Sequence, residues 1–180
     1  NQVRAVLIAT GVLDFSVVGG GDKAVFILKT NGDLVSFGAN TEGCLGLGDL
    51  VDRSVPTAVR TNGTSGAVFT NVVKLMQSPG GVCTAMGVVK SDGTLWVCGY
   101  NGYGALGLGD NDRRTIFTQV PIPEPVSDVM INADAFGDGA PTMYVRTDVG
   151  TIYASGYNAH GQLSTSDTNY SYVLRRMVFS

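Results

Sequence analysis

Residues 102–107 have the spacing of a phosphate-binding loop. They read Gly-Tyr-Gly-Ala-Leu-Gly, the G-x-G-x-x-G pattern of dinucleotide-binding proteins. That pattern binds a pyrophosphate only where a helix follows it and an acidic residue lies about 20 positions further on. Here residues 108–112 read Leu-Gly-Asp-Asn-Asp, a turn sequence, and a similar block at 41–46 lacks the first glycine. We therefore interpret these glycines as part of a repeat and predict no cofactor.

Acidic residues cluster after two Leu-Gly-Leu-Gly runs, where a calcium loop could be imagined. The aspartates concerned are Asp49, Asp52, Asp110 and Asp112. An EF-hand loop places its ligands at alternate positions and closes with a glutamate, and both features are missing here. We expect these side chains to accept hydrogen bonds from turn amides or to pair with Arg53 and Arg113. The sequence therefore predicts no metal site.

His160 is the only histidine, and so the only candidate of its kind for a general base. A nucleophilic mechanism would need a serine or cysteine motif that the histidine could activate. No such motif lies near His160 in the sequence. We predict an exposed loop histidine and a chain that is not an enzyme.

The three cysteines, Cys44, Cys83 and Cys98, have no metal-type spacing. A zinc site would need more ligands than these cysteines and His160 supply. The simplest interpretation is three buried or half-buried thiols. The alternative is one disulfide with one thiol left over.

Charge and hydropathy argue against two classes of partner. The chain has 12 Lys and Arg against 15 Asp and Glu, a net charge of −3. Its basic residues form no run beyond the pairs 113–114 and 175–176, so we expect no nucleic-acid binding. The longest apolar stretch, 3–18, is interrupted by polar residues and falls short of the ~20 apolar residues of a membrane span. We therefore expect no membrane insertion.

A glycine-anchored unit occurs three times. Segments 31–49, 92–110 and 149–167 align without a gap, with offsets of 61 and 57 residues. Asn31-Gly32 and Asp92-Gly93 are strong hairpin signals, and we expect type I′ turns there because both central residues of that turn need a positive φ. Apolar runs stand on both sides of each turn. The expected hairpin strands are 24–28 with 34–37, 85–89 with 95–98, and 143–145 with 152–155.

Each unit offers two further strands. The upstream ones are 12–18, 72–76 and 126–131, and the downstream ones are 54–59, 116–120 and 172–177. The sequence thus predicts an all-β fold, a partial β-propeller of three four-stranded antiparallel blades. We expect blade units at 11–60, 71–121 and 126–178, with residues 1–10 as an outer strand of a neighbouring blade. Because ring propellers need about 4–8 blades, we expect the chain to be part of a longer chain or of a larger assembly.

The repeat resembles that of the regulator-of-chromosome-condensation family. The motif G-x-N-x-x-G-x-L-G-L-G-D stands at 38–49 and at 99–110, and Arg-Ser-Val-Pro-Thr at 53–57 matches a segment that often follows it. The resemblance covers nearly the whole chain and implies a propeller of about seven blades. It also implies exchange factors for small GTPases, protein-binding inhibitors such as a secreted β-lactamase inhibitor, or scaffolds. Two features depart from it: the Gly-x-x-His signature has no histidine here, and residues 162–167 read Gln-Leu-Ser-Thr-Ser-Asp.

Tyrosines and asparagines gather in the segments after each hairpin. Such side chains offer contact area and hydrogen bonds at low entropic cost. We predict partner-contact loops that contain Tyr100, Asn101, Tyr103, Tyr157, Asn158, His160, Tyr170 and Tyr172. Packing of the tyrosines between blades is the alternative.

These observations favour a non-catalytic interaction or structural module. Its partners would be other proteins, or further blades from the same or another chain. The low charge and the Gly, Thr and Asn content favour an extracellular protein or a virion appendage such as a tail fibre. The alternatives are a guanine-nucleotide-exchange-type regulator of a small GTPase and a secreted protein-binding enzyme inhibitor.

Overall fold

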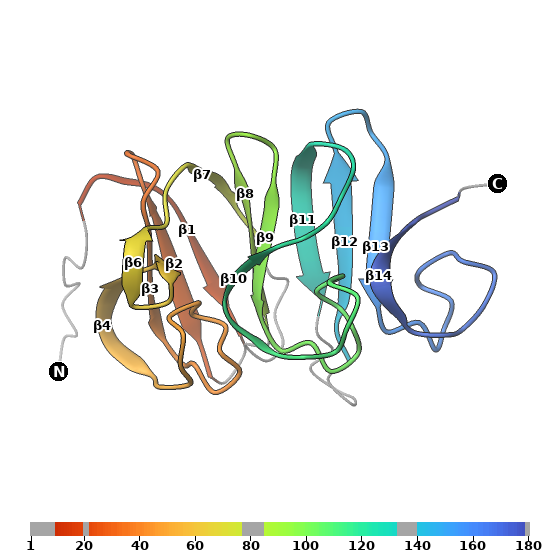
Figure 1. Ribbon diagram of the computed structural model, residues 1–180, viewed down its shortest axis with the longest axis horizontal. Coiled ribbons are helices and arrows are strands. Elements are labelled where there is room, and N and C mark those ends of the chain that lie inside the picture. The colour runs from red at the N-terminus through yellow and green to blue at the C-terminus, as the bar shows by residue number, and fades with distance from the viewer. Residues whose placement is uncertain (1–9, 20–21, 77–84, 133–139, 179–180) are drawn as a thin grey trace, which may run out of the picture.

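Three antiparallel four-stranded sheets stand side by side along the molecule in the computed structural model (Figure 1). The structure describes residues 10–19, 22–76, 85–132 and 140–178. Blade 1 contains β1 (Val12–Val18), β2 (Ala24–Lys29), β3 (Leu34–Gly38) and β4 (Arg53–Ala58). Blade 2 contains β7 (Val72–Leu75), β8 (Ala85–Lys90), β9 (Leu95–Gly99) and β10 (Arg114–Gln119). Blade 3 contains β11 (Val126–Asn132), β12 (Thr142–Thr147), β13 (Ile152–Gly156) and β14 (Ser171–Arg176).

Within each blade the strands pair in chain order, and this confirms the partial propeller that the repeats predict. The expected strands overlap the observed ones in all three units. The outer strand of a neighbouring blade predicted for residues 1–10 falls almost entirely outside the described residues.

The hairpin turns differ from the type I′ turns expected. Gly32 has φ 83°, but Asn31 is not among the residues with positive φ. The amide of Gly32 donates to the carbonyl of Lys29 at 2.9 Å, and the amide of Lys29 donates to the carbonyl of Asp33 at 2.9 Å. This is a three-residue loop, in which a turn is followed by one left-handed residue. Glycine is needed at the third position only, which explains why Val149 replaces the Asn or Asp in the third repeat.

A short hairpin between blades 1 and 2 has no counterpart in the predicted repeat. It consists of β5 (Arg60–Asn62) and β6 (Ser65–Val68). Its turn residue Gly63 lies against the loop of blade 1, because a Cβ on Gly63 would lie 2.6 Å from Gly48 Cα. Both strands are mostly exposed, so they lack the alternation of apolar and polar residues by which strands are recognised.

Apolar side chains between the blades form one continuous core. Strand β2 packs on β7, and β8 packs on β11. This core contains the buried side chains of Phe26 and Leu28 from β2 and of Met86 and Val88 from β8. Gly87 is also buried, and a Cβ on it would lie 3.3 Å from Val129 of blade 3. Each blade therefore buries its faces against its neighbours, as propeller blades do.

The two junctions between blades use the same backbone contacts. The amide of Gly48 in blade 1 donates to the carbonyl of Thr115 in blade 2 at 2.8 Å. The amide of Gly109 in blade 2 donates to the carbonyl of Tyr172 in blade 3, also at 2.8 Å. The loop of one blade thus docks on the outermost strand of the next, and the repetition of this contact fixes successive blades in the same relative position.

The third repeat keeps the loop conformation with serines in place of two glycines. Ser164 (φ 53°) and Ser166 (φ 61°) occupy the left-handed positions that Gly107 (φ 67°) and Gly109 (φ 89°) occupy in the second repeat. A left-handed conformation costs a non-glycine residue roughly 1–2 kcal/mol. The loop of blade 3 therefore carries backbone strain that the other two loops avoid.

The cysteines do not match the interpretation as three thiols. Cys44 is disulfide-bonded, whereas Cys98 is a buried free thiol whose pKa is raised because burial disfavours the thiolate. This corresponds to the alternative of one disulfide with one thiol left over. Cys83 lies outside the described residues.

Candidate protein-interaction surface

The long loops that follow β3, β9 and β13 lie at one edge of the three blades, at the bottom of Figure 1. A buried asparagine organises each of them. Asn101 accepts a hydrogen bond from the amide of Leu106 at 2.9 Å and donates to the carbonyl of Asp110 at 2.9 Å. It is 0% exposed. The side-chain amide thus hydrogen-bonds two separate backbone groups of the loop. These bonds hold the loop in place of the backbone hydrogen bonds of a helix or sheet.

Asn158 has the same role in blade 3. It accepts from the amide of Leu163 and donates to the carbonyl of Asp167, both at 2.8 Å, and is also 0% exposed. The prediction that Asn101 and Asn158 contact a partner is therefore wrong. Both amides are inside the loops, where they satisfy backbone groups that would otherwise be buried without partners.

Aspartates complete the loops, as expected, although one of the expected ion pairs is different. Asp110 pairs with Arg114 at 2.6 Å, not with Arg113, and the hydrogen bond from Arg114 lowers the pKa of Asp110. Arg113 instead pairs with Glu42 of the blade 1 loop at 2.8 Å. Asp49 pairs with Arg53 as predicted. The ion pair between an aspartate and the arginine four residues later thus recurs in the first and second repeats. Arg113, through Glu42, joins blade 2 to blade 1.

Two of the predicted contact tyrosines, Tyr100 and Tyr172, lie against glycines of the blade 2 loop, although Tyr172 is 42% exposed. A Cβ on Gly104 would overlap the ring of Tyr172 and lie 2.6 Å from its Cα, so the loop of blade 2 rests directly on Tyr172. A Cβ on Gly102 would overlap the Tyr100 hydroxyl, which places that ring over its own loop. Both side chains therefore help to pack the blade 2 loop, and contact of either one with a partner stays a prediction.

The other three tyrosines form one cluster across the seam between blades 2 and 3. Tyr103 comes from the blade 2 loop, and Tyr157 and Tyr170 come from the two ends of the blade 3 loop. The ring centroid of Tyr103 lies 5.6 Å from that of Tyr157 and 5.2 Å from that of Tyr170, both edge-to-face. The rings of Tyr157 and Tyr170 are 5.2 Å apart. We call Tyr103, Tyr157, Tyr170 and His160 the tyrosine cluster.

His160 extends this cluster at its exposed side. Its ring lies 6.1 Å from that of Tyr157, edge-to-face. Tyr170 is 41% exposed, and Tyr103 and Tyr157 are half-buried. Mutual packing of the rings limits their rotation, so the cluster offers a preformed aromatic surface with hydroxyl and imidazole groups. Such surfaces bind proteins because little side-chain entropy is lost on contact.

The described residues show little of the geometry that dinucleotide binding, metal binding or membrane spanning would need. Residues 102–107 form consecutive turns and are not followed by a helix. Within the described ranges, no group of three or more His, Cys, Asp or Glu residues is arranged to hold a metal ion. Likewise, no helix found there has the length and apolar character to cross a membrane.

Comparisons with known proteins agree with the fold and the repeat. The family model of the Regulator of chromosome condensation (RCC1) repeat matches residues 31–74 and 92–131. The X-linked retinitis pigmentosa GTPase regulator of Mus musculus is 31% identical over 152 residues, which are 82% of this chain and 13% of that protein.

Solved structures show the same architecture. Human WBSCR16 superposes with a TM-score of 0.74 at 20% identity, over 98% of this chain and 40% of that one. Prp20p from Saccharomyces cerevisiae superposes with a TM-score of 0.67 at 17% identity, over 94% of this chain and 39% of that one. The described chain thus spans a minor part of each of these proteins. Its motifs, its three blades and these similarities show that it belongs to the regulator of chromosome condensation (RCC1) repeat family.

Proposed function

We propose that this chain is a non-catalytic protein-interaction module that binds a partner through the tyrosine cluster at the loop edge of blades 2 and 3. The observation that supports this most strongly is the meeting of three tyrosine rings from two blades, at 5.2–5.6 Å, on a surface that is partly exposed. Aromatic residues that bridge two rigid elements are typical binding hot spots.

Relatives support a binding role. The solved structure of Prp20p is described together with its binding to Gsp1p and histones, and other RCC1-repeat proteins are described as regulators. In a propeller, the loops at one edge of several blades form a shared surface to which a second protein has access.

Selection of binding peptides tests the proposal without a known partner. Peptides displayed on phage are selected on the folded chain, and the affinity of the selected peptides is then measured for variants. We expect Tyr157→Ala and Tyr170→Ala to weaken binding about tenfold or more, as for hot-spot tyrosines. The matched control is Val51→Ala, at an exposed loop residue of blade 1 outside the cluster. Selected peptides whose affinity is unchanged by both tyrosine variants would contradict the proposal.

Regulation of a small GTPase is the second candidate function. It is supported by the similarity to the X-linked retinitis pigmentosa GTPase regulator of Mus musculus, and by the similarity to Prp20p, whose structure is described with its binding to Gsp1p. It predicts that sub-stoichiometric amounts of the chain accelerate nucleotide release from a small GTPase. Acceleration of that kind would replace the binding-only assignment. A secreted enzyme inhibitor would be a further case of protein binding, and an extracellular or virion location stays a prediction from composition.

A further inference from the structure

Two equivalent positions of the repeat meet at both junctions between blades. One stands directly before the second loop glycine, and the other directly before the outermost strand of the next blade. At the first junction these positions hold Glu42 and Arg113, which form an ion pair at 2.8 Å. At the second junction they hold Tyr103 and Tyr170, whose ring centroids are 5.2 Å apart. Because an ion pair closes the first junction, the blade architecture does not require aromatic residues here, and this favours a binding role for the tyrosines.

The exposure of Tyr170 is a property of its position in the blade. Tyr170 is 41% exposed. Arg113 has the equivalent position in blade 2, and its side chain is 39% exposed although blades 1 and 3 stand on both sides of it. A following blade therefore leaves this position open. His160 differs, because it stands at the position through which Glu42 and Tyr103 contact the following blade. The site consists of the three tyrosines of the cluster.

The loops that carry these tyrosines hold a carboxylate without a cationic partner. Each arginine of the blade 2 loop, and the arginine beside the blade 3 loop, is already paired. The pairs are Arg113 with Glu42, Arg114 with Asp110, and Arg175 with Asp167. Asp112 is exposed, and its carboxylate forms no ion pair with any residue that the structure describes. It belongs to the same loop as Tyr103, so this edge combines aromatic rings with an uncompensated negative charge.

This combination selects for a cation. The faces of tyrosine rings are negative and attract cations that approach them. Arginine fits best, because its planar guanidinium stacks on a ring and also donates two parallel hydrogen bonds to a carboxylate. The three ring centroids are only 5.2–5.6 Å apart, so the rings contact one another and a cation would lie over their outer surface.

We propose that the tyrosine cluster binds an arginine side chain of a partner peptide, with Asp112 as the neighbouring carboxylate. The inference rests on the function proposed above, because it names the chemistry of the partner at the same site. The guanidinium lies on the exposed part of Tyr170, where Tyr103 and Tyr157 hold the ring in place. The peptide that carries it is cationic, since the loops of blades 2 and 3 offer it no unpaired cation in the described ranges.

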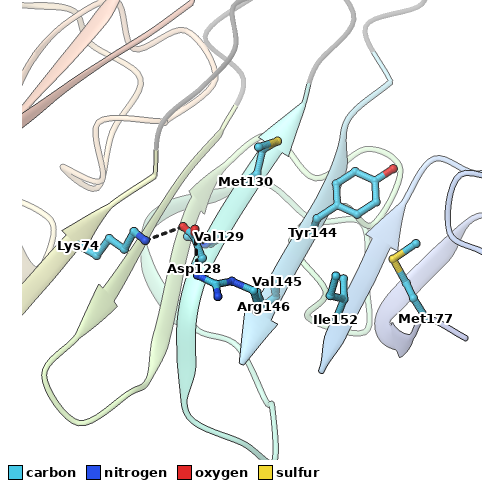
Figure 2. Close-up of a pocket in the computed structure, with 9 residues that line it drawn as sticks. All are labelled: Lys74, Asp128, Val129, Met130, Tyr144, Val145, Arg146, Ile152 and Met177. Carbon is cyan, nitrogen blue, oxygen red and sulfur yellow. Dashed lines mark hydrogen bonds and ion pairs between the residues drawn. The ribbon is translucent and has the colours of Figure 1, made fainter. Parts of the chain in front are cut away.

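A second surface with an aromatic ring has the opposite charge. A groove of about 580 Å³ on the outer face of blade 3 is lined by Met130 and the half-buried Tyr144, among others (Figure 2). Lys74 (2.9 Å) and Arg146 (3.7 Å) share the single carboxylate of Asp128 at one side of it, so this side is net positive. The same face of blades 1 and 2 packs on the next blade. An arginine peptide should therefore bind at the loop edge and not in this groove.

Calorimetric titration of the full chain with selected peptides tests the proposal. Peptides selected from a phage library on the folded chain should be enriched in arginine. Replacing that arginine with citrulline, which has the same shape without the charge, should weaken binding about fivefold or more. Lysine should recover part of the loss, because it restores the charge but not the planar group. A citrulline peptide that binds as tightly as its arginine parent would overturn the proposal.

Asp112→Asn tests the carboxylate. Blade 3 has Asn169 at the equivalent loop position, so the variant should fold. It should weaken binding of the arginine peptide about threefold and leave binding of the citrulline peptide unchanged, as expected for an exposed ion pair. Asp148→Asn is the matched control, at an exposed residue of the turn between β12 and β13 at the opposite edge of blade 3 (Figure 1). Equal effects of the two variants on the arginine peptide would overturn the role of Asp112.

The cationic partner and the binding function fail in different ways. Selected peptides that lack arginine, and whose binding is lost in Tyr170→Ala, would overturn the cationic partner and leave the binding function intact. Peptides whose binding does not depend on Tyr170 would overturn both. Tyr170→Leu should weaken binding of the arginine peptide more than Tyr170→Phe, because phenylalanine keeps the ring face. The reverse order would contradict the stacking of the guanidinium. Circular dichroism checks that each variant is folded.

Discussion

Ser155 of blade 3 donates its hydroxyl hydrogen bond to the backbone carbonyl of Ala105 in blade 2, at 2.8 Å. The same contact joins Cys98 to Cys44 one blade earlier. Ser155 is 0% exposed, so this hydrogen bond lies inside the junction. It links the stability of two successive blades, because breaking it leaves a buried carbonyl without this donor.

Ser155→Ala should destabilise the chain by about 1–3 kcal/mol, the usual cost of leaving a buried polar group unsatisfied. Urea unfolding measures the change. Ser155→Cys is the matched control, because the second repeat has a cysteine at this position, and it should recover part of the loss. Equal stabilities of Ser155→Ala and the wild type would show that the contact contributes nothing to the junction.

A pair of glycine substitutions separates the contact between blades from backbone strain. Gly104 (φ 72°) and Gly161 (φ 76°) occupy equivalent loop positions, but only Gly104 is close to a following strand. Gly161→Ala should cost roughly 1–2 kcal/mol, the left-handed penalty alone. Gly104→Ala should cost about 2 kcal/mol more, because the added methyl group overlaps Tyr172 and forces strain into a packed junction. Similar unfolding midpoints for the two variants would contradict the described packing.

Asn101→Ala should destabilise the blade 2 loop by about 2–3 kcal/mol, since the amide of Leu106 and the carbonyl of Asp110 both lose their partner. Hydrogen exchange should show the loss of protection at the Leu106 amide in particular. The outcome against this account is an unchanged exchange rate at Leu106.

Ser166→Gly should stabilise the chain by about 1 kcal/mol, because it removes a left-handed non-glycine residue. Ser164→Gly should gain less, since the Ser164 hydroxyl donates to the carbonyl of Val178, 14 residues further on, at 2.9 Å, whereas the Ser166 hydroxyl donates only to the carbonyl of the neighbouring Thr165 at 2.6 Å. Thermal unfolding of the two variants should rank Ser166→Gly first. The reverse order would show that the serine hydroxyls, not the backbone angles, decide the stability of this loop.

The pH dependence of stability should contain a contribution from Asp110. Its pKa is lowered by the hydrogen bond from Arg114, so the contribution is fully present above the ordinary carboxyl range and is lost as the pH falls through the lowered value. The pair is partly exposed, so the contribution should be at most about 1 kcal/mol. Arg114→Met should flatten this part of the acid-unfolding curve. A curve of unchanged slope would exclude the pair as its cause.

The repeat predicted the strands well, because glycines at turns and apolar runs beside them are set by local backbone chemistry. Comparison of equivalent positions across the three repeats also shows structural roles that are not visible when each residue is considered alone. Asn40, Asn101 and Asn158 recur at one position in all three repeats, which is a sign of a buried structural amide and not of a contact surface. The same alignment pairs Arg53 with Arg114 and would have corrected the assignment of Arg113.

Other features depend on contacts that no local pattern encodes. The hairpin of β5 and β6 is short and exposed, so neither strand has a periodic apolar face. The tyrosine cluster requires two blades to be side by side, and only the fold brings Tyr103 to Tyr170. Exposure of Met130 and Phe15 depends on what covers the end blades, and neighbouring residues in the sequence do not show that.

Fluorine NMR of the chain labelled with 3-fluorotyrosine tests the proposed binding site most directly. The chain has seven tyrosines, so each signal can be assigned with single Tyr→Phe variants. On addition of a selected peptide or a partner protein, we predict shifts of the Tyr103, Tyr157 and Tyr170 signals and unchanged signals of Tyr144 and Tyr153. Shifts confined to Tyr144 and Tyr153, with the cluster signals unchanged, would contradict the account.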